Sequence, residues 1–379
     1  MPVLSFKAFA AVASVAGLEL CLATACRAQP LPEPTGPHPV GRITYPLVDA
    51  SRTDDQGSHK DGKREFMAHV WYPARPGAEA KPAPWMPADW ARLEEKGILG
   101  MRLRPPSVPS AVDVPKVLAS VVAHAREDAP LAASPERLPV LLFSPGSLMF
   151  PSEYSSLVED LASHGFVVVG NVPTGYVAAV SFPGGSVTRS FKKPNFPLWT
   201  GDLTHVLDQL GVWNATGGHR FFGRLDLDHV GAFGHSAGGN AVAAIAAKEE
   251  RLQAIVLLDP GLVRPEDGPA IPTLILKSEN ADFKRKNPEV AKEKERTRAE
   301  FVRRAKPGVQ ITLLGAEHLS FTDLAVIKAF GLPGDGKAFI DTTRAVVGEF
   351  FGRHLLGKRS ELIGKGSAKY SLARIDLPR

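Results

Sequence analysis

Residues 138–357 alternate between short apolar runs and segments of helical length, and this alternation restricts the fold more than any other feature of the chain. Short apolar runs are typical of buried strands, and longer mixed segments between them are typical of helices. The expected strands are residues 140–143, 166–169, 230–233, 254–258, 273–276 and 310–314. The expected helices are residues 153–163, 202–210, 239–249, 284–306 and 341–356. This order predicts an α/β fold with a mostly parallel central sheet and helices on both faces.

The domain organisation is expected to be simple, with a single domain over residues 40–379 and a Pro-rich linker over residues 29–39. Residues 43–72 alternate enough between apolar and polar side chains to indicate early antiparallel strands. Residues 74–138 are rich in proline and are interpreted as an insertion. Residues 177–200 show no regular pattern, and we expect them to form a lid-like loop that faces the substrate.

The first 28 residues have the pattern of a secretory signal peptide. Lys7 precedes a run of apolar or small residues, and small residues near its end offer cleavage sites. Both cysteines, Cys21 and Cys26, lie in this segment, so no disulfide is expected in the folded domain. We therefore expect a secreted or periplasmic protein. The residues before Cys26 loosely resemble a lipobox, which leaves a lipoprotein attached through Cys26 as an alternative.

The formal net charge of +5 does not indicate a nucleic-acid partner. Residues 284–306 contain ten Lys or Arg and four Glu, and this excess of six accounts for the whole net charge. No aromatic interleaving supports base stacking there, so the segment is interpreted as an exposed surface helix. Peripheral membrane contact through residues 85–99, which include an amphipathic segment, and the oligomeric state both stay open.

The motif Gly-His-Ser-Ala-Gly-Gly at residues 234–239 lies between an expected strand and an expected helix. In this context it predicts a nucleophile elbow, a tight turn that presents Ser236 above the sheet edge. Gly234 and Gly238 remove side chains that would collide in such a turn. Backbone N–H groups at the start of the helix are unpaired and point toward any anion that develops. Ser236 is therefore the candidate nucleophile of an acyl-transfer reaction.

A serine hydroxyl needs a base within hydrogen-bond reach and an acid that orients this base. His318 follows the last expected strand and is the candidate base. Two acids compete for the orienting position. Asp259 ends the strand 254–258, and Asp282 follows the next strand, so that spacing alone does not choose between them. The N–H groups of Ser147 and Ala237 are the expected donors of the oxyanion hole.

Several short motifs together look like the secreted (plasma, or type II) platelet-activating-factor acetylhydrolase family of α/β-hydrolases. These motifs are Leu-Phe-Ser-Pro-Gly at residues 142–146, Asp-Leu-Ala-Ser-His-Gly-Phe-Val at 160–167, the elbow at 234–239, Leu-Asp at 258–259 and His-Leu-Ser-Phe-Thr-Asp at 318–323. The likeness covers residues from about 40 to 357. It implies the α/β-hydrolase fold, assigns the triad acid to Asp259 rather than Asp282, and implies hydrolysis of short or oxidised acyl esters without calcium.

The chain departs from the family pattern at two positions. Pro145 stands where the family commonly has His, and Ala237 stands where it commonly has Phe or Met. Because Ala237 widens the space beside Ser236, substrate choice is not carried over from the family. A polyester or dienelactone-type hydrolase and a non-catalytic envelope-associated binding protein are the alternatives.

We expect a serine ester hydrolase that acts on a small-molecule or lipid ester and uses Ser236, His318 and Asp259. No cofactor and no metal are expected, because His38, His59 and His69 lack the spacing of metal ligands.

Overall fold

The computed structural model describes residues 28–54, 61–75, 80–86, 112–134, 136–183, 187–189, 196–361 and 370–376. The predicted signal peptide lies outside these ranges, apart from Ala28, and so does the amphipathic segment 89–99. No helix within the described ranges is both long and apolar enough to span a bilayer.

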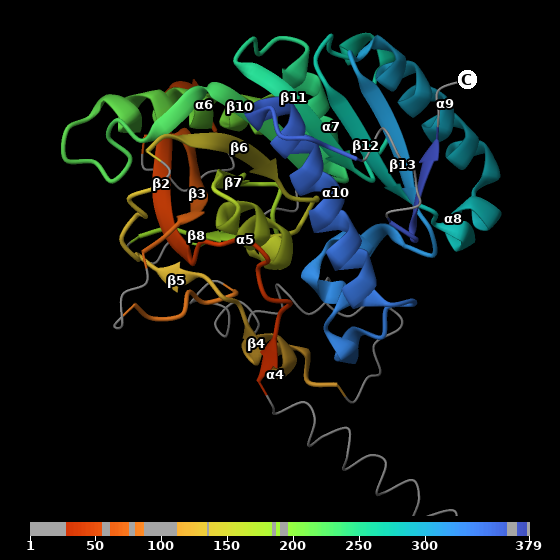
Figure 1. Ribbon diagram of the computed structural model, residues 1–379, viewed down its shortest axis with the longest axis horizontal. Coiled ribbons are helices and arrows are strands. Elements are labelled where there is room, and N and C mark those ends of the chain that lie inside the picture. The colour runs from red at the N-terminus through yellow and green to blue at the C-terminus, as the bar shows by residue number, and fades with distance from the viewer. Residues whose placement is uncertain are drawn as a thin grey trace, which may run out of the picture.

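A ten-stranded sheet runs through the centre of the molecule, in the order β14-β13-β12-β11-β10-β6-β7-β3-β2-β5 (Figure 1). Six neighbouring strands are parallel: β6 (Leu138–Ser144), β7 (Val167–Val172), β10 (Leu225–His235), β11 (Leu252–Leu258), β12 (Thr273–Ser278) and β13 (Gly308–Leu313). The remaining four are β2 (Val40–Thr53), β3 (Lys63–Pro73), β5 (Arg126–Glu127) and β14 (Ala373–Asp376). β3 pairs antiparallel with both β2 and β7, and β14 pairs antiparallel with β13. The predicted α/β fold with a mostly parallel sheet is confirmed.

Helices cover both faces of the sheet, and each face has its own hydrophobic core. On one face, α5 (Ser155–Ser163) and α10 (Gly336–Leu356) pack against a core that contains Phe143 and Phe233. On the other face, α6 (Phe196–Ala215), α7 (Ala237–Ala246) and α9 (Pro288–Arg304) pack against a core that contains Leu142 and Ala232. Successive strand residues point to opposite faces, so both faces of the parallel strands are apolar.

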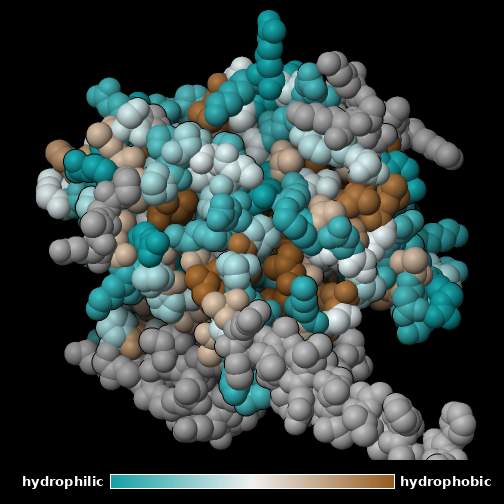
Figure 2. Space-filling view, turned by 60° about the horizontal axis from the view of Figure 1, so that its bottom comes forward, coloured by the Kyte–Doolittle hydropathy of each residue, from teal (hydrophilic) through white to brown (hydrophobic). Residues whose placement is uncertain are grey.

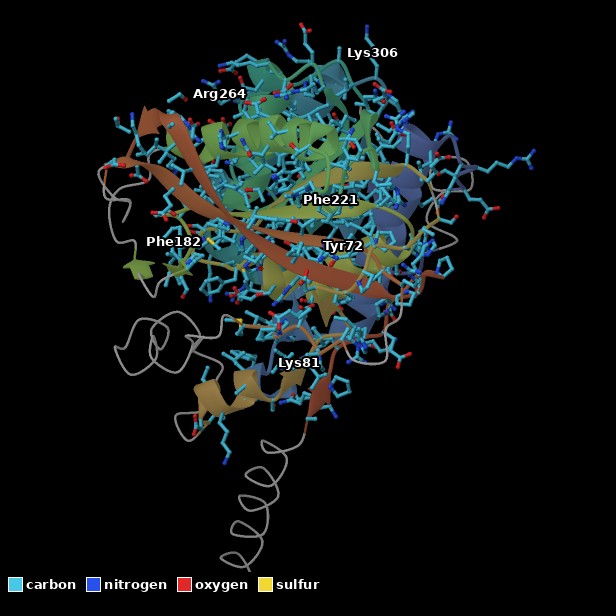
Figure 3. All side chains as sticks on the ribbon, turned by 90° about the vertical axis from the view of Figure 1, so that its left-hand side faces the viewer. Tyr72, Lys81, Phe182, Phe221, Arg264 and Lys306 are labelled. Carbon is cyan, nitrogen blue, oxygen red and sulfur yellow. The ribbon has the colours of Figure 1, made fainter. Side chains whose placement is uncertain are left out.

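Short elements complete the structure. The helical ones are α4 (Val114–Ala119), α8 (Ala281–Lys286), η1 (Pro151–Tyr154), η2 (Pro265–Asp267), η3 (His318–Phe321), η4 (Asp323–Ala325) and η5 (Lys328–Phe330). The strands are β1 (Gln29–Pro30), β4 (Val121–Val122), β8 (Ala179–Ser181) and β9 (Val187–Arg189). Tyr72 and Phe221, which lie close together in Figure 3, mark the packing of β3 against the turn that follows α6, with ring centroids 5.7 Å apart.

The segment 177–200 contains more regular structure than its pattern suggests. β8 and β9 form a small antiparallel hairpin, and α6 begins at Phe196 instead of at the expected residue 202. Proline is tolerated in the first turn of a helix, so Pro197 does not delay its start. Trp199 is fully buried and anchors this first turn. Residues 184–186 and 190–195 lie outside the described ranges, and the lid stays a prediction.

The Pro-rich segment 29–39 lies against the domain. β1 pairs parallel with β4, and Leu31 is buried. The N–H group of Thr35 donates to Asp160 of α5 over 2.7 Å, and the N–H group of Gly36 donates to Ser163 over 2.9 Å. The segment that we expected to be a linker therefore contacts both the inserted residues and a helix of the central fold.

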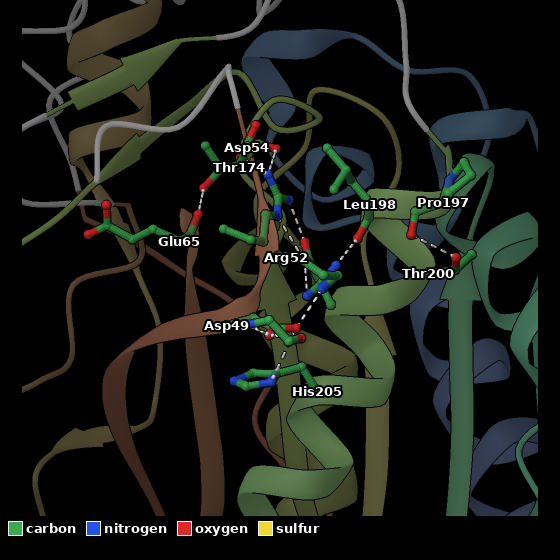
Figure 4. Close-up of polar contacts among 12 residues, drawn as sticks. Asp49, Arg52, Asp54, Glu65, Thr174, Pro197, Leu198, Thr200 and His205 are labelled. Carbon is green, nitrogen blue, oxygen red and sulfur yellow. Dashed lines mark hydrogen bonds and ion pairs between the residues drawn. The ribbon is translucent and has the colours of Figure 1, made fainter. Parts of the chain in front are cut away.

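A buried ionic network fixes the start of α6 (Figure 4). The side chain of Arg64 on β3 is completely buried and pairs with Asp54 and Asp202, with each N–O distance at 2.5 Å. Arg52 also donates to Asp202, over 3.0 Å, and to the carbonyl oxygen of Leu198 over 2.9 Å. These contacts join β2 and β3 to the helix turn that carries Trp199.

Two more carboxyl groups, those of Glu159 in α5 and Asp323 in η4, are buried. Burial raises the pKa of Glu159 to about 7, although the N–H groups of His124 and Ala125 favour its charged form. Burial also raises the pKa of Asp323 to about 7, against hydrogen bonds from Ser156 and Trp85. Trp85 donates from Nε1 to Asp323 over 3.0 Å and is only 3% exposed. Trp85 therefore packs into the domain, and peripheral membrane contact by the rest of residues 85–99 stays an open question.

Candidate active site

Ser236 occupies a sharp turn between β10, which ends at His235, and α7, which begins at Ala237. Its φ of 53° and ψ of −122° are an unusual conformation for a residue other than glycine. A side chain at Gly234 would place its Cβ 2.4 Å from the carbonyl oxygen of Gly238. A Cβ at Gly238 would lie 2.2 Å from the carbonyl oxygens of Ser144 and Pro145. The local geometry is that of the predicted nucleophile elbow, and both glycines are sterically required.

Three predicted site residues meet at the carboxyl ends of the parallel strands. His318 Nε2 lies 2.9 Å from Ser236 Oγ, and His318 Nδ1 lies 2.7 Å from Asp259 Oδ2. Asp259 comes directly after β11, and His318 opens η3 after β13. The side chain of Asp259 is 3% exposed, whereas that of His318 is 40% exposed. One continuous line of hydrogen bonds therefore runs from a buried carboxylate through an accessible imidazole to the hydroxyl of Ser236.

The carboxylate of Asp259 has further partners that hold it in its charged form. Ser278 donates from Oγ to Oδ2 over 2.7 Å, and Arg298 donates from Nη2 to Oδ1 over 3.1 Å. Burial of Asp259 opposes ionisation, but the hydrogen bond from His318 and the positive charge of Arg298 hold its pKa well below the usual range. Asp259 is therefore ionised at any pH at which the protein would work.

Asp282, the second candidate for the acid, does not reach the site. It lies in α8 with 51% of its side chain exposed, and it pairs with Arg285 and Lys286. Its carboxylate is thus held by basic residues of its own short helix. The structure brings Asp259, and not Asp282, to His318.

The two predicted oxyanion donors lie on neighbouring loops. Gly238 packs directly on Ser144 and Pro145, so the elbow touches the loop that carries Ser147. In the described part of the chain, no acceptor contacts the N–H groups of Ser147 and Ala237. The N–H groups on either side of Ser147 are occupied: that of Gly146 by Tyr154 Oη over 3.1 Å, and that of Leu148 by a carbonyl oxygen over 2.6 Å. Within the described residues, the N–H groups of Ser147 and Ala237 are therefore without an acceptor, and their part in an oxyanion hole stays a prediction.

Two exposed apolar residues are close in sequence to site residues. Leu148 adjoins Ser147 and is 38% exposed, and Leu262 follows Asp259 by three residues and is 52% exposed. Figure 2 shows one face of the molecule, on which hydrophobic residues gather in patches near the centre, between hydrophilic ones. The described residues include no group of three or more His, Cys, Asp or Glu that could hold a metal ion.

Several contacts at the site were missed by reasoning from the sequence. Arg298 was counted among the exposed cations of residues 284–306, yet it is only 5% exposed. The signal was present, because Thr297, Arg298, Phe301 and Val302 form one face of α9 and all four are buried. Tyr154 and His235 carry no comparable pattern, since their contacts come from separate parts of the chain.

Comparisons with known proteins agree with this fold and with the motifs. A family model described as "Platelet-activating factor acetylhydrolase, isoform II" matches residues 23–174. This match contains the loop with Ser147 and ends before Ser236. A curated relative from Arthroderma benhamiae, described as "Probable 1-alkyl-2-acetylglycerophosphocholine esterase", is 26% identical over 242 residues. The aligned part is 61% of this chain and 59% of the relative, so this chain spans less than two thirds of that protein.

A solved structure extends the similarity to nearly the whole chain. A ferulic acid esterase from Streptomyces cinnamoneus aligns with a TM-score of 0.73 and 27% sequence identity. The alignment covers 92% of this chain and 100% of the other. The fold of this chain is therefore similar to that of a solved esterase over most of its length.

Proposed function

We propose that this chain, which belongs to a platelet-activating-factor acetylhydrolase-like family, is a serine carboxylic ester hydrolase. The observation that carries the proposal is the line of two hydrogen bonds, 2.7 Å and 2.9 Å long, that joins Asp259, His318 and Ser236. A nucleophile, a base and an orienting acid in this order are what acyl transfer requires.

We propose one step for each group, in line with the distances between them. His318 donates a hydrogen bond from its protonated Nδ1 to Asp259, which leaves Nε2 unprotonated and free to take the proton of Ser236 Oγ. The serine oxygen then attacks the ester carbon, and the N–H groups of Ser147 and Ala237 stabilise the oxyanion. His318 returns the proton to the departing alcohol, and the acyl group stays on Ser236. Water, deprotonated by His318, attacks the acyl-enzyme and releases the carboxylic acid.

Short-chain or oxidised acyl esters, including those derived from phospholipids, are the proposed substrate class. The family match and the curated relative support this choice. The exposed Leu148 and Leu262 supply apolar contact for an acyl chain at the rim. The fold similarity to a ferulic acid esterase favours a second candidate, an aromatic acyl ester, because Ala237 leaves room beside Ser236.

A fluorophosphonate probe tests the nucleophile directly. We expect one adduct, on Ser236, which is lost in Ser236→Ala while the folded state is retained. Absence of an adduct on folded wild-type protein would support the non-catalytic alternative instead. The substrate is tested with p-nitrophenyl esters of increasing chain length, a 2-acetyl phospholipid and methyl ferulate. A preference for long acyl chains would contradict the proposed class.

Secretion or export to the periplasm is proposed from the signal-peptide pattern. The mass and N-terminal sequence of the mature protein test it. Cleavage after residue 25 or 28 is expected for a free protein. An N-terminal diacylglyceryl group on Cys26 would identify a lipoprotein.

A further inference from the structure

His235, the residue before Ser236, lies completely buried beneath the site with both ring nitrogens engaged. Nδ1 lies 2.8 Å from Tyr154 Oη, and Nε2 lies 3.0 Å from the carbonyl oxygen of His318. Tyr154 is also buried, at 1% exposure. Neither side chain can reach a substrate, and the hydrolytic steps described above use neither of them.

The proton positions in this cluster follow from its chemistry. A carbonyl oxygen only accepts, so Nε2 of His235 carries a proton and donates to His318. Burial and the neighbouring His318 lower the pKa of His235 to about 3, so the ring is neutral and Nδ1 is an acceptor. Tyr154 must then donate its only hydroxyl proton to Nδ1. The Sδ atom of Met149, 3.0 Å from the same oxygen, is the weaker acceptor.

The oxygen of Tyr154 in turn accepts the N–H group of Gly146 over 3.1 Å. The resulting chain of bonds runs from Gly146 through Tyr154 and His235 to the backbone of His318. A Cβ at Gly146 would lie 3.1 Å from His235 Nδ1 and 3.3 Å from Tyr154 Oη, so the loop has little freedom to move toward them. These hydrogen bonds link three segments that are far apart in sequence: the loop with Gly146 and Ser147, the elbow at Ser236 and the loop that carries His318.

Packing around the cluster is equally tight. The rings of Tyr154 and Phe143 are 4.8 Å apart, and those of His235 and His318 are 4.6 Å apart. Phe321, in the same short helix as His318, lies 5.9 Å from His235. A shift of either loop would break buried hydrogen bonds, which costs more than breaking exposed ones.

We propose that Tyr154 and His235 are positioning residues that hold the Ser147 donor and the His318 base at a fixed spacing around Ser236. The inference rests on the proposed ester hydrolysis. The N–H groups of Gly146 and Leu148, on either side of Ser147, are both hydrogen-bonded. In this proposal, the bond from Gly146 to Tyr154 therefore also fixes the direction in which the N–H group of Ser147 points, toward the oxyanion. Misplacement of reacting groups by fractions of an ångström lowers kcat more than it raises KM.

The test uses two substitutions that break the same bond from opposite sides. Tyr154→Phe removes the donor, and His235→Gln keeps an N–H for the His318 carbonyl but lacks an acceptor at the Nδ1 position. Each should lower kcat by about tenfold or more, with KM within about twofold. The double variant should be no worse than Tyr154→Phe, because that substitution already removes both the bond to His235 and the acceptor of the Gly146 N–H group. The inhibition constant of a trifluoromethyl ketone should rise by the factor by which kcat/KM falls.

Tyr72→Phe is the matched control. Tyr72 is also buried, and its hydroxyl donates to Ala129 over 2.7 Å. Its neighbour Trp71 pairs with Val168, near the start of β7, whereas Ser236 follows the carboxyl end of β10, so Tyr72 lies at the opposite end of the parallel strands. This variant should lose stability and keep kcat.

The outcomes separate the two proposals. Wild-type protein that is folded but neither labels nor turns over esters contradicts the ester hydrolase itself. Wild-type protein that turns over, with kcat unchanged in Tyr154→Phe and His235→Gln, overturns the positioning inference alone. Losses that add in the double variant, or that Tyr72→Phe reproduces, also overturn it.

Discussion

Replacing Asp259 by Asn should disable the site without disturbing its packing, because the surroundings fix the orientation of the new amide. Arg298 donates to Oδ1, so an NH2 group placed there would face a cation. The amide oxygen must therefore take the Oδ1 position, and the NH2 group must take the Oδ2 position. At Oδ2 it faces His318 Nδ1, 2.7 Å away in the wild-type site.

Two donors cannot face each other, so His318 is driven to the tautomer that carries its proton on Nε2. This nitrogen can then no longer accept the proton of Ser236. In serine proteases the corresponding loss is about 10⁴ in kcat, or roughly 5.5 kcal/mol of transition-state stabilisation. We expect the same order of magnitude here, since the line of contacts is the same.

The assay compares kcat on p-nitrophenyl acetate and the rate of fluorophosphonate labelling. Asp282→Asn is the control and should stay within about twofold of wild type, as surface substitutions usually have small effects. Adding Arg298→Met to Asp259→Asn should recover about tenfold, because the amide can then turn its oxygen toward His318. Activity of Asp259→Asn within tenfold of wild type would refute the reasoning, and so would a larger loss in Asp282→Asn.

Three further predictions test other parts of the structure. The pKa of Glu159, about 7, lies above its ordinary value of 4.5, so the folded state binds the extra proton and stability falls as pH rises through this window. Glu159→Gln should reduce this pH-dependent loss of stability by about 3 kcal/mol or less. The measurement is Tm between about pH 4.5 and 8, and a dependence of Tm on pH that is the same in the variant as in wild type would contradict the prediction. Gly238→Ala should lower kcat/KM by more than about 100-fold, because its Cβ would collide with the loop at Ser144 and Pro145. The control is Gly211→Ala, where a Cβ meets nothing within 4 Å, and this variant should stabilise α6 by about 0.5–1 kcal/mol. If urea unfolding gave the same change in stability for both variants, this would contradict a steric collision at Gly238. Arg64→Met removes the buried cation shared by Asp54 and Asp202, and Asp202 then keeps Arg52 as its partner. It should cost about 3–5 kcal/mol of unfolding free energy, and a loss below about 1 kcal/mol would show that the network contributes little.

The order of elements and the line of reacting groups could be predicted because both depend on local patterns. Short apolar runs predicted the parallel strands. Ser236 and His318 each follow one of these strands, which predicted that both lie at the carboxyl edge of the sheet. The choice between Asp259 and Asp282 needed more than spacing, because each acid follows a strand. The family resemblance favoured Asp259, and the geometry brings the same residue to His318.

The supporting contacts could not be predicted, because they join segments that are distant in sequence. Tyr154 meets His235 across 81 residues, and Arg298 meets Asp259 across 39. The spacing of Thr297, Phe301 and Val302 along α9 indicates that Arg298 is on the buried face, but it does not indicate which carboxylate Arg298 meets. The early start of α6 has a similar origin, since Trp199 is buried by neighbours that its own sequence does not specify.

β14 has a consequence for how this chain can be shortened or fused. It closes the side of β13, where Ile311 and Leu313 are buried and pair with Ile375 and Ala373. Without residues 373–376, the backbone of β13 would become an open, apolar edge of a parallel sheet. Such an edge recruits strands from other molecules. Removal of these few residues should therefore appear first as aggregation during expression, long before it affects the chemistry at Ser236.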